Sequence, residues 1–78
     1  MNRKKNRTGL SNTQNVRFGG LIAVIDSREP YPTIMEDLET RGFALRKQGN
    51  VIITDKGRKE TVRLATLAGL MTSIEKGE

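Results

Sequence analysis

Hydrophobic positions in the first half of the chain fall at helical spacing. The residues at i, i+3, i+4 and i+7 of one helix face are Phe18, Leu21, Ile22 and Ile25. Ser11 followed by Gln14 matches a capping box in front of them. The spacing predicts a helix over residues 12–26, and a short buried strand over residues 21–25 is the alternative that the same apolar run allows.

A connection and a shorter helix follow. Two prolines within residues 27–32 disfavour helix there, so this stretch is predicted to connect two helices. Thr33 and Glu36 match a Thr-x-x-Glu capping box, which predicts that the second helix begins at Thr33. The Arg-Gly pair ending at Gly42 predicts its end, because glycine takes the left-handed conformation after a helix without a Cβ penalty.

A β-hairpin is predicted after this helix. Residues 43–47 alternate apolar with small or charged side chains, and residues 51–53 are β-branched. Gly49 and Asn50 form a favourable two-residue loop between these segments. The pattern therefore predicts two short antiparallel strands with a basic, glycine-containing tip.

Helical spacing returns in the last third of the chain. Asp55 is an N-cap candidate for a helix over residues 56–70. The apolar residues at helical spacing are Leu64, Leu67, Ala68 and Met71. This stripe is more than the hairpin alone can cover, which predicts a homodimer through the last helix.

These elements fit one small domain. The chain has 78 residues, of which 35% are hydrophobic, and this allows a single modest core. The fold class predicted is α+β, in the order helix, short helix, two-stranded hairpin and helix. This domain is assigned to residues 12–78, and a disordered basic arm is assigned to residues 1–11.

Three segments in the middle of the chain carry a family resemblance. Residues 33–43 read T-I-M-E-D-L-E-T-R-G-F, residues 46–50 read R-K-Q-G-N and residues 53–58 read I-T-D-K-G-R. In this order they resemble the second half of winged helix-turn-helix DNA-binding regulators, over residues 33–60. The resemblance implies a winged helix whose hairpin is the wing, which would meet phosphates or the minor groove. It also places the short helix at the recognition-helix position, where the candidate residues are Thr33, Glu36, Asp37 and Thr40. The outward face of this helix carries Glu36, Asp37, Glu39 and Thr40.

Charge points to a polyanionic partner. Fourteen Lys and Arg against nine Asp and Glu give a net charge of +5. Carboxylates on the short helix are repelled by phosphates unless they accept from cytosine amino groups, so the main contacts are assigned elsewhere. The candidate nucleic-acid contacts are Arg3, Lys4, Lys5, Arg7, Arg17, Arg46, Lys47, Asn50, Lys56, Arg58 and Lys59.

Other classes of function find little support in the composition. The chain has no Cys and no His, and it shows no glycine-rich phosphate loop, metal-ligand constellation or activated nucleophile. We therefore expect no enzymatic activity, no cofactor and no metal. The longest apolar run, residues 21–25, is far too short to cross a bilayer. The expected location is the cytoplasm, with nucleoid association in a bacterial or phage source.

Tyr31 lies between the two prolines of the connection. It is interpreted as a packing anchor, with stacking on a base or sugar as the alternative.

The leading prediction is a small regulator of transcription that binds double-stranded DNA through a basic wing and N-terminal arm. One alternative is an RNA-binding or ribosome-associated winged helix. Another is a protein-interaction module that docks through its acidic helix.

Overall fold

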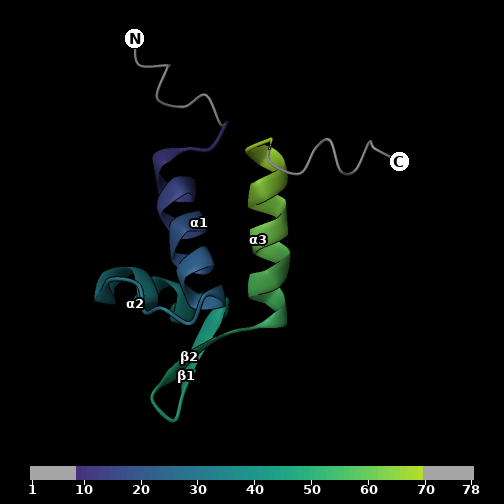
Figure 1. Cartoon of the computed structure of the whole chain (residues 1–78). Helices are drawn as coiled ribbons and strands as arrows, with labels where there is room; N and C mark the ends of the chain where they lie inside the picture. The colour runs from purple at the N-terminus through teal and green to yellow at the C-terminus, as the bar shows by residue number, and fades with distance from the viewer. Residues whose placement is uncertain (1–8, 70–78) are drawn as a thin grey trace.

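The computed structural model describes residues 9–69, which form three helices and one antiparallel two-stranded sheet. In chain order the elements are α1 (Asn12–Ile25), α2 (Pro32–Thr40), β1 (Ala44–Lys47), β2 (Asn50–Ile53) and α3 (Asp55–Leu67). α1 and α3 lie side by side and run in opposite directions, α2 lies across the C-terminal end of α1, and the hairpin projects beyond that end (Figure 1). The predicted α+β order of a small winged helix is confirmed.

α1 begins where its sequence predicted. The hydroxyl of Ser11 accepts from the Gln14 amide at 3.1 Å, and the Gln14 side chain accepts from the Ser11 amide at 3.0 Å. The helix runs through residues 21–25, so the strand alternative is wrong. The boundary of the predicted arm is also wrong, because Leu10 is buried in the hydrophobic core and Ser11 caps the helix. Residues 1–8 of that arm lie outside the described residues.

α2 begins one residue earlier than its capping-box pattern predicted. Its N-cap is Tyr31, which makes no side-chain capping bond, and Pro32 is the first helical residue. Proline suits this position because its φ is already helical and it has no N–H to satisfy. Thr33 therefore lies within the helix, and its assignment as N-cap is wrong. Tyr31 is 77% exposed, so its interpretation as a packing anchor is wrong as well.

The end of α2 agrees with the sequence. Gly42 has a φ of 81°, in the left-handed region that glycine favours. Its N–H donates to the carbonyl of Glu39 at 3.0 Å, and the N–H of Phe43 donates to the carbonyl of Leu38 at 2.8 Å. These paired bonds form a Schellman motif, which turns the chain directly from α2 into β1.

The loop of the hairpin consists of Gln48 and Gly49, so the predicted loop of Gly49 and Asn50 is wrong by one residue. The two loop residues have φ values of 52° and 82°, and two positive values in succession are typical of a type I′ turn. The resulting register sets Ala44 opposite Ile53 on the inner side of the hairpin. The predicted loop would instead have set Ala44 opposite the aspartate that begins α3.

α3 is capped by Thr54, not by Asp55 as predicted. The Thr54 backbone keeps the extended conformation of β2, and its hydroxyl accepts from the Gly57 amide at 2.9 Å. Asp55 is therefore the first helical residue, where a carboxylate is favourable to the helix dipole. α3 ends at Leu67, short of the predicted residue 70. Residues 70–78 lie outside the described residues.

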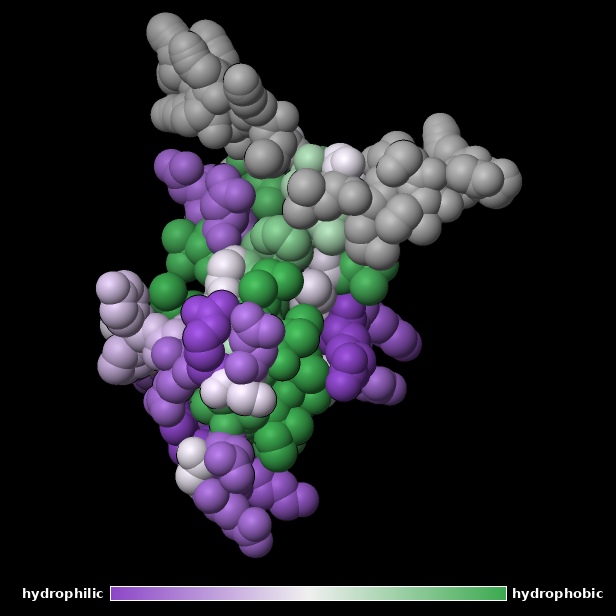
Figure 2. All heavy atoms as spheres, in the orientation of Figure 1, coloured by the Kyte–Doolittle hydropathy of each residue, from purple (hydrophilic) through white to green (hydrophobic). Residues whose placement is uncertain are grey.

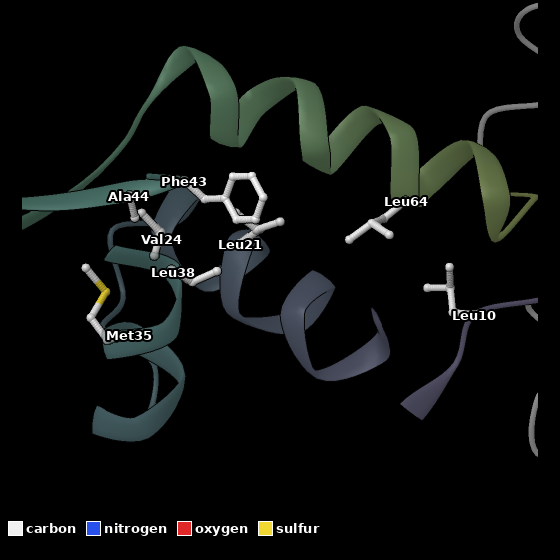
Figure 3. Close-up of a cluster of buried hydrophobic side chains, with 8 residues drawn as sticks. All are labelled: Leu10, Leu21, Val24, Met35, Leu38, Phe43, Ala44 and Leu64. Atoms are coloured by element: carbon white, nitrogen blue, oxygen red, sulfur yellow. The ribbon is translucent and has the colours of Figure 1, made fainter. Parts of the chain in front are cut away.

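The core lies where the helices and the base of the hairpin meet. Its buried members, drawn in Figure 3, are Leu10, Leu21, Val24, Met35, Leu38, Phe43, Ala44 and Leu64. Leu64 is fully buried within this core, so the first residue of the apolar stripe that suggested a dimer is covered by the same chain, whereas Leu67 is 47% exposed. The other end of that stripe, Met71, lies outside the described residues.

α3 begins in direct contact with the base of the hairpin. A Cβ atom on Gly57 would overlap the carbonyl oxygen of Phe43 and would lie 2.8 Å from a side-chain carbon of Ile53. Because the nearest obstacle is main chain, it cannot move aside as a flexible side chain would. Gly57 therefore lets the first turn of α3 approach the hairpin more closely than any other residue would allow.

The close approach at Gly57 gives a stability prediction. Helix propensity alone favours Gly57→Ala by about 1 kcal/mol. We expect the opposite sign, with Gly57→Ala destabilising the protein by about 2 kcal/mol or more because of overpacking. Gly19→Ala is the matched control, because a Cβ at Gly19 meets nothing within 4 Å, and it should stabilise. Urea unfolding of both variants measures the difference, and stabilisation by Gly57→Ala would contradict the contact.

Candidate nucleic-acid interface

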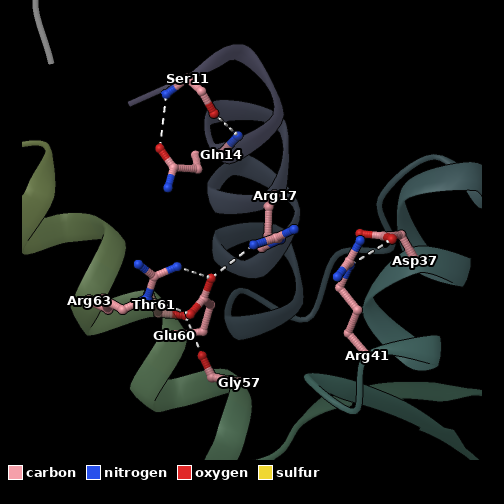
Figure 4. A network of polar contacts seen from close by, with 9 residues as sticks. All are labelled: Ser11, Gln14, Arg17, Asp37, Arg41, Gly57, Glu60, Thr61 and Arg63. Carbon is pink, nitrogen blue, oxygen red and sulfur yellow. Dashed lines mark hydrogen bonds and ion pairs between the residues drawn. The ribbon is translucent and has the colours of Figure 1, made fainter. Parts of the chain in front are cut away.

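A polar network joins α1 to α3. The carboxylate of Glu60 accepts from Arg17 at 3.1 Å and from two nitrogens of Arg63, each at 2.9 Å (Figure 4). Glu60 and the Arg17 side chain are mostly buried, with 9% and 13% of their surfaces exposed. The hydrogen bond from Arg63 lowers the pKa of Glu60 most strongly, burial opposes this shift, and Arg17 adds to it. One carboxylate therefore serves two guanidinium groups.

Arg17 is not available as a nucleic-acid contact, and its assignment as one is corrected. Its guanidinium is paired with Glu60 and lies over the ring of Phe43, with 5.7 Å from Cζ to the ring centroid, and only 13% of the side chain is exposed. Its position is explained by packing, because the aliphatic stem covers the core while the charge reaches a carboxylate on α3. Arg17 thus holds α1 against α3.

Arg46 lies on β1 but does not project freely. Its guanidinium is 2.8 Å from the carboxylate of Glu29, which lies in the connection between α1 and α2. The hydrogen bond with Glu29 raises the pKa of Arg46 and lowers that of Glu29, and the charge of Glu39 adds to the shift of Arg46. The charge of Arg46 is therefore partly compensated by carboxylates of the same chain.

Lys56 also has partners within the fold. Its Nζ lies over the ring of Phe43, 5.4 Å from the centroid, and its side chain passes beside Gly42 at the C-terminal end of α2. A cation is unfavourable at the N-terminus of its own helix, but it is favourable at the C-terminus of another. The position of Lys56 is therefore explained by α2 and Phe43.

Three of the predicted cations remain exposed without such partners. They are Lys47 at the hairpin tip and Arg58 and Lys59 in the first turn of α3, and none of them has an ion pair or ring contact within residues 9–69. Asn50, also exposed, lies opposite Lys47 in the hairpin, so both side chains are on one face. Figure 2 shows hydrophilic atoms at the lowest tip of the molecule, below a hydrophobic patch. Arg3, Lys4, Lys5 and Arg7 lie outside the described residues.

The helix at the recognition position presents a different surface. Glu36, Glu39 and Thr40 are exposed, as predicted for its outward face, and the recognition candidate Thr33 is exposed as well. Asp37 is held by Arg41 at 2.9 Å, one turn further along the helix. Among the described residues Glu36 and Glu39 make no ion pair, although Glu39 acts on the charge of Arg46. α2 therefore offers acceptors and negative charge, and Arg41, its C-cap residue, is already paired.

Models of known protein families, curated proteins and solved structures include no match to this chain. No helix between residues 9 and 69 combines the length and the apolar character that a membrane span requires. A function therefore has to be inferred from the side chains described above.

The shared carboxylate of Glu60 predicts a pH dependence of stability. The pKa of Glu60 is below its ordinary value of 4.5 in the folded chain, so its stabilising effect is complete above that value and disappears as the pH falls through the lower folded value. Glu60→Gln should cost about 2 kcal/mol at pH 7, where two guanidinium groups lose their charged acceptor.

The measurement is urea unfolding of both proteins over a pH series. The gap between the wild type and Glu60→Gln should close as the pH falls into the acid range. Glu36→Gln, at an exposed and unpaired carboxylate, is the matched control and should change stability by less than about 0.5 kcal/mol at any pH. A gap that is independent of pH would show that Glu60 contributes by packing alone.

Proposed function

We propose that this chain is a small winged-helix protein that binds double-stranded DNA and acts in transcription regulation. The observation that carries the proposal is the set of exposed cations that no carboxylate within residues 9–69 neutralises: Lys47, Arg58 and Lys59. Lys47 is the last residue of β1, at the tip of a hairpin that projects from the molecule, and Arg58 and Lys59 lie near the start of α3, which follows the hairpin (Figure 1). Cations on a projecting element reach phosphates without burying a large surface.

In this proposal the exposed side chains make different kinds of contact with DNA. Lysine and arginine at these positions contact phosphates, which set affinity and register but carry no sequence information. Asn50, opposite Lys47, supplies an amide that donates to and accepts from base edges. The basic residues of positions 3–7 add further phosphate contacts from the N-terminal side. α2 contributes specificity only through Thr33, Thr40 or a carboxylate that accepts from cytosine.

The experiment compares a triple variant, Lys47→Ala, Arg58→Ala and Lys59→Ala, with the wild type on duplex DNA. Binding should weaken by a similar factor on unrelated sequences, because the lost contacts are to phosphates. The slope of log K against log salt should fall by about 0.9 for each phosphate contact removed. Fluorescence anisotropy at several salt concentrations gives both quantities.

Arg28→Ala is the matched control for that experiment. Arg28 is an exposed arginine in the connection between α1 and α2, paired with Asp26 at 3.2 Å, and its removal should leave the salt slope unchanged. If Arg28→Ala lost as much affinity per charge removed as the triple variant, the binding would depend on net charge alone and the proposed surface would be contradicted. Tighter binding to structured RNA than to duplex DNA would replace the DNA by RNA as the partner.

The acidic surface of α2 supports a second candidate, in which this helix docks a basic protein. Glu36 and Glu39 are exposed and unpaired, one turn apart on the same helix. If DNA binding proceeds as proposed, the double variant Glu36→Gln and Glu39→Gln should bind duplex DNA unchanged or more tightly, because repulsion of phosphates is reduced.

The same anisotropy titration decides between the candidates. A shift in sequence preference by about 1 to 3 kcal/mol, with little change in salt slope, would mean that α2 reads bases. Absence of nucleic-acid binding in the wild type and in all variants would leave α2 as the surface to test with a basic protein.

A further inference from the structure

A groove lies between the N-terminal half of α1 and α2, away from the exposed cations of the proposed interface. Its volume is about 370 Å³, within the range of sites that hold small molecules. The two helices are in close contact at Gly20, where a Cβ atom would lie only 2.6 Å from the side chain of Ile34. The α1 residues that line the groove precede this contact, so Gly20 closes one end of it.

One part of the groove is apolar. Val16 of α1 and Ile34 of α2 line it from opposite sides. Val16 is 52% exposed, although α1 also contributes residues to the core. A ligand with an apolar body would cover both side chains and gain the usual free energy of apolar burial. The hydroxyls of Thr13 and Thr33, which also line the groove, provide hydrogen-bonding groups at its edge.

The charged part of the groove carries a surplus of positive charge. Arg17 and Arg41 both line it, as does Asp37, which is already paired with Arg41 at 2.9 Å. Among the described residues Arg17 is paired with Glu60, which does not line the groove and is shared with Arg63. Figure 4 shows the Arg17 side chain between Glu60 on one side and the Asp37–Arg41 pair on the other.

Arg17 also has an unsatisfied donor. Its Nε is buried and has no hydrogen-bond partner among the described residues. A buried donor without an acceptor is costly, and the cost is larger for a charged group. After a small rotation of the guanidinium toward the groove, an anionic ligand there would accept a hydrogen bond from Nε.

We propose that this groove binds a small organic carboxylate. The apolar body of the ligand lies against Val16 and Ile34, and its carboxylate lies toward Arg17 and Arg41. An inorganic anion would leave the apolar walls uncovered, and an organic cation would meet two guanidinium groups. This ligand site includes none of the exposed cations Lys47, Arg58 and Lys59 and does not depend on DNA binding, although Thr33 of α2 lines it.

Three probes of one shape test the charge requirement: benzoate, benzamide and benzamidinium. The full chain, labelled with ¹³C in its valine and isoleucine methyl groups, is titrated with each probe and followed by NMR. Benzoate should saturate and shift the methyl signals of Val16 and Ile34, with an affinity at least about tenfold above that of benzamide, as a charge-assisted hydrogen bond provides. Benzamidinium should not bind. Equal binding of the three probes, or no saturation with benzoate, overturns the proposal.

Variants then test the location. Val16→Trp fills the groove and should abolish the benzoate shifts at Ile34. Val62→Trp is the matched control, because Val62 is 51% exposed on α3, and it should bind benzoate like the wild type. Undiminished benzoate binding by Val16→Trp overturns the assignment.

A milder change covers the case in which the tryptophan disturbs folding. Arg41→Gln places a shorter but still polar side chain at this half-exposed position and removes one positive charge from the groove. It should weaken benzoate binding several-fold while leaving the weak binding of benzamide unchanged. An equal effect on both probes would show that charge plays no part and would contradict the proposal.

Discussion

The carbonyl group of Phe43 fixes the position of the hairpin relative to α3. Its oxygen accepts from the Thr54 amide at 3.0 Å and faces Gly57, whose missing side chain allows the contact. The Thr54 hydroxyl donates to the carbonyl of Gly42 at 2.7 Å, so the end of α2 is tied to the same point. Three elements therefore meet at one piece of main chain, and the spacing between the hairpin tip and the first turn of α3 follows from it.

The fold was predictable because its signals are local. The glycine at position 42, the β-branched run of β2 and the capping box at Ser11 each act within a few residues, and each is found as expected. The errors arose where neighbouring residues compete for one role. Pro32 displaced Thr33 from the start of α2, because a proline needs no amide acceptor at the first helical position. The observed turn lies one residue before the predicted one. The register of the strands, set by burial of one face, decides which two residues form the turn.

The candidate site was only partly predictable because charge pairing is long-range. Arg17 and Glu60 are 43 residues apart in the sequence, and Arg46 and Glu29 are 17 residues apart. No local sequence pattern therefore indicates either ion pair. The pair of Glu60 and Arg63, three residues apart on one helix, is the part of this network that spacing could have indicated. A count of basic residues therefore overstates the charge available to a partner, and the sequence cannot tell structural arginines from free ones.

Ion pairing within the fold also leaves positive and negative charge on different surfaces of the molecule. Arg46 and Arg41 are paired with Glu29 and Asp37, whereas Glu36 and Glu39 of α2 make no ion pair among the described residues and give that surface its negative charge. The exposed cations without partners lie instead on the hairpin tip and at the start of α3. A polyanion approaching this molecule is attracted to one side and repelled by the helix at the recognition position. In the proposed complex, electrostatics thus favours an approach led by the wing and α3, and α2 enters a groove only where bases compensate its carboxylates.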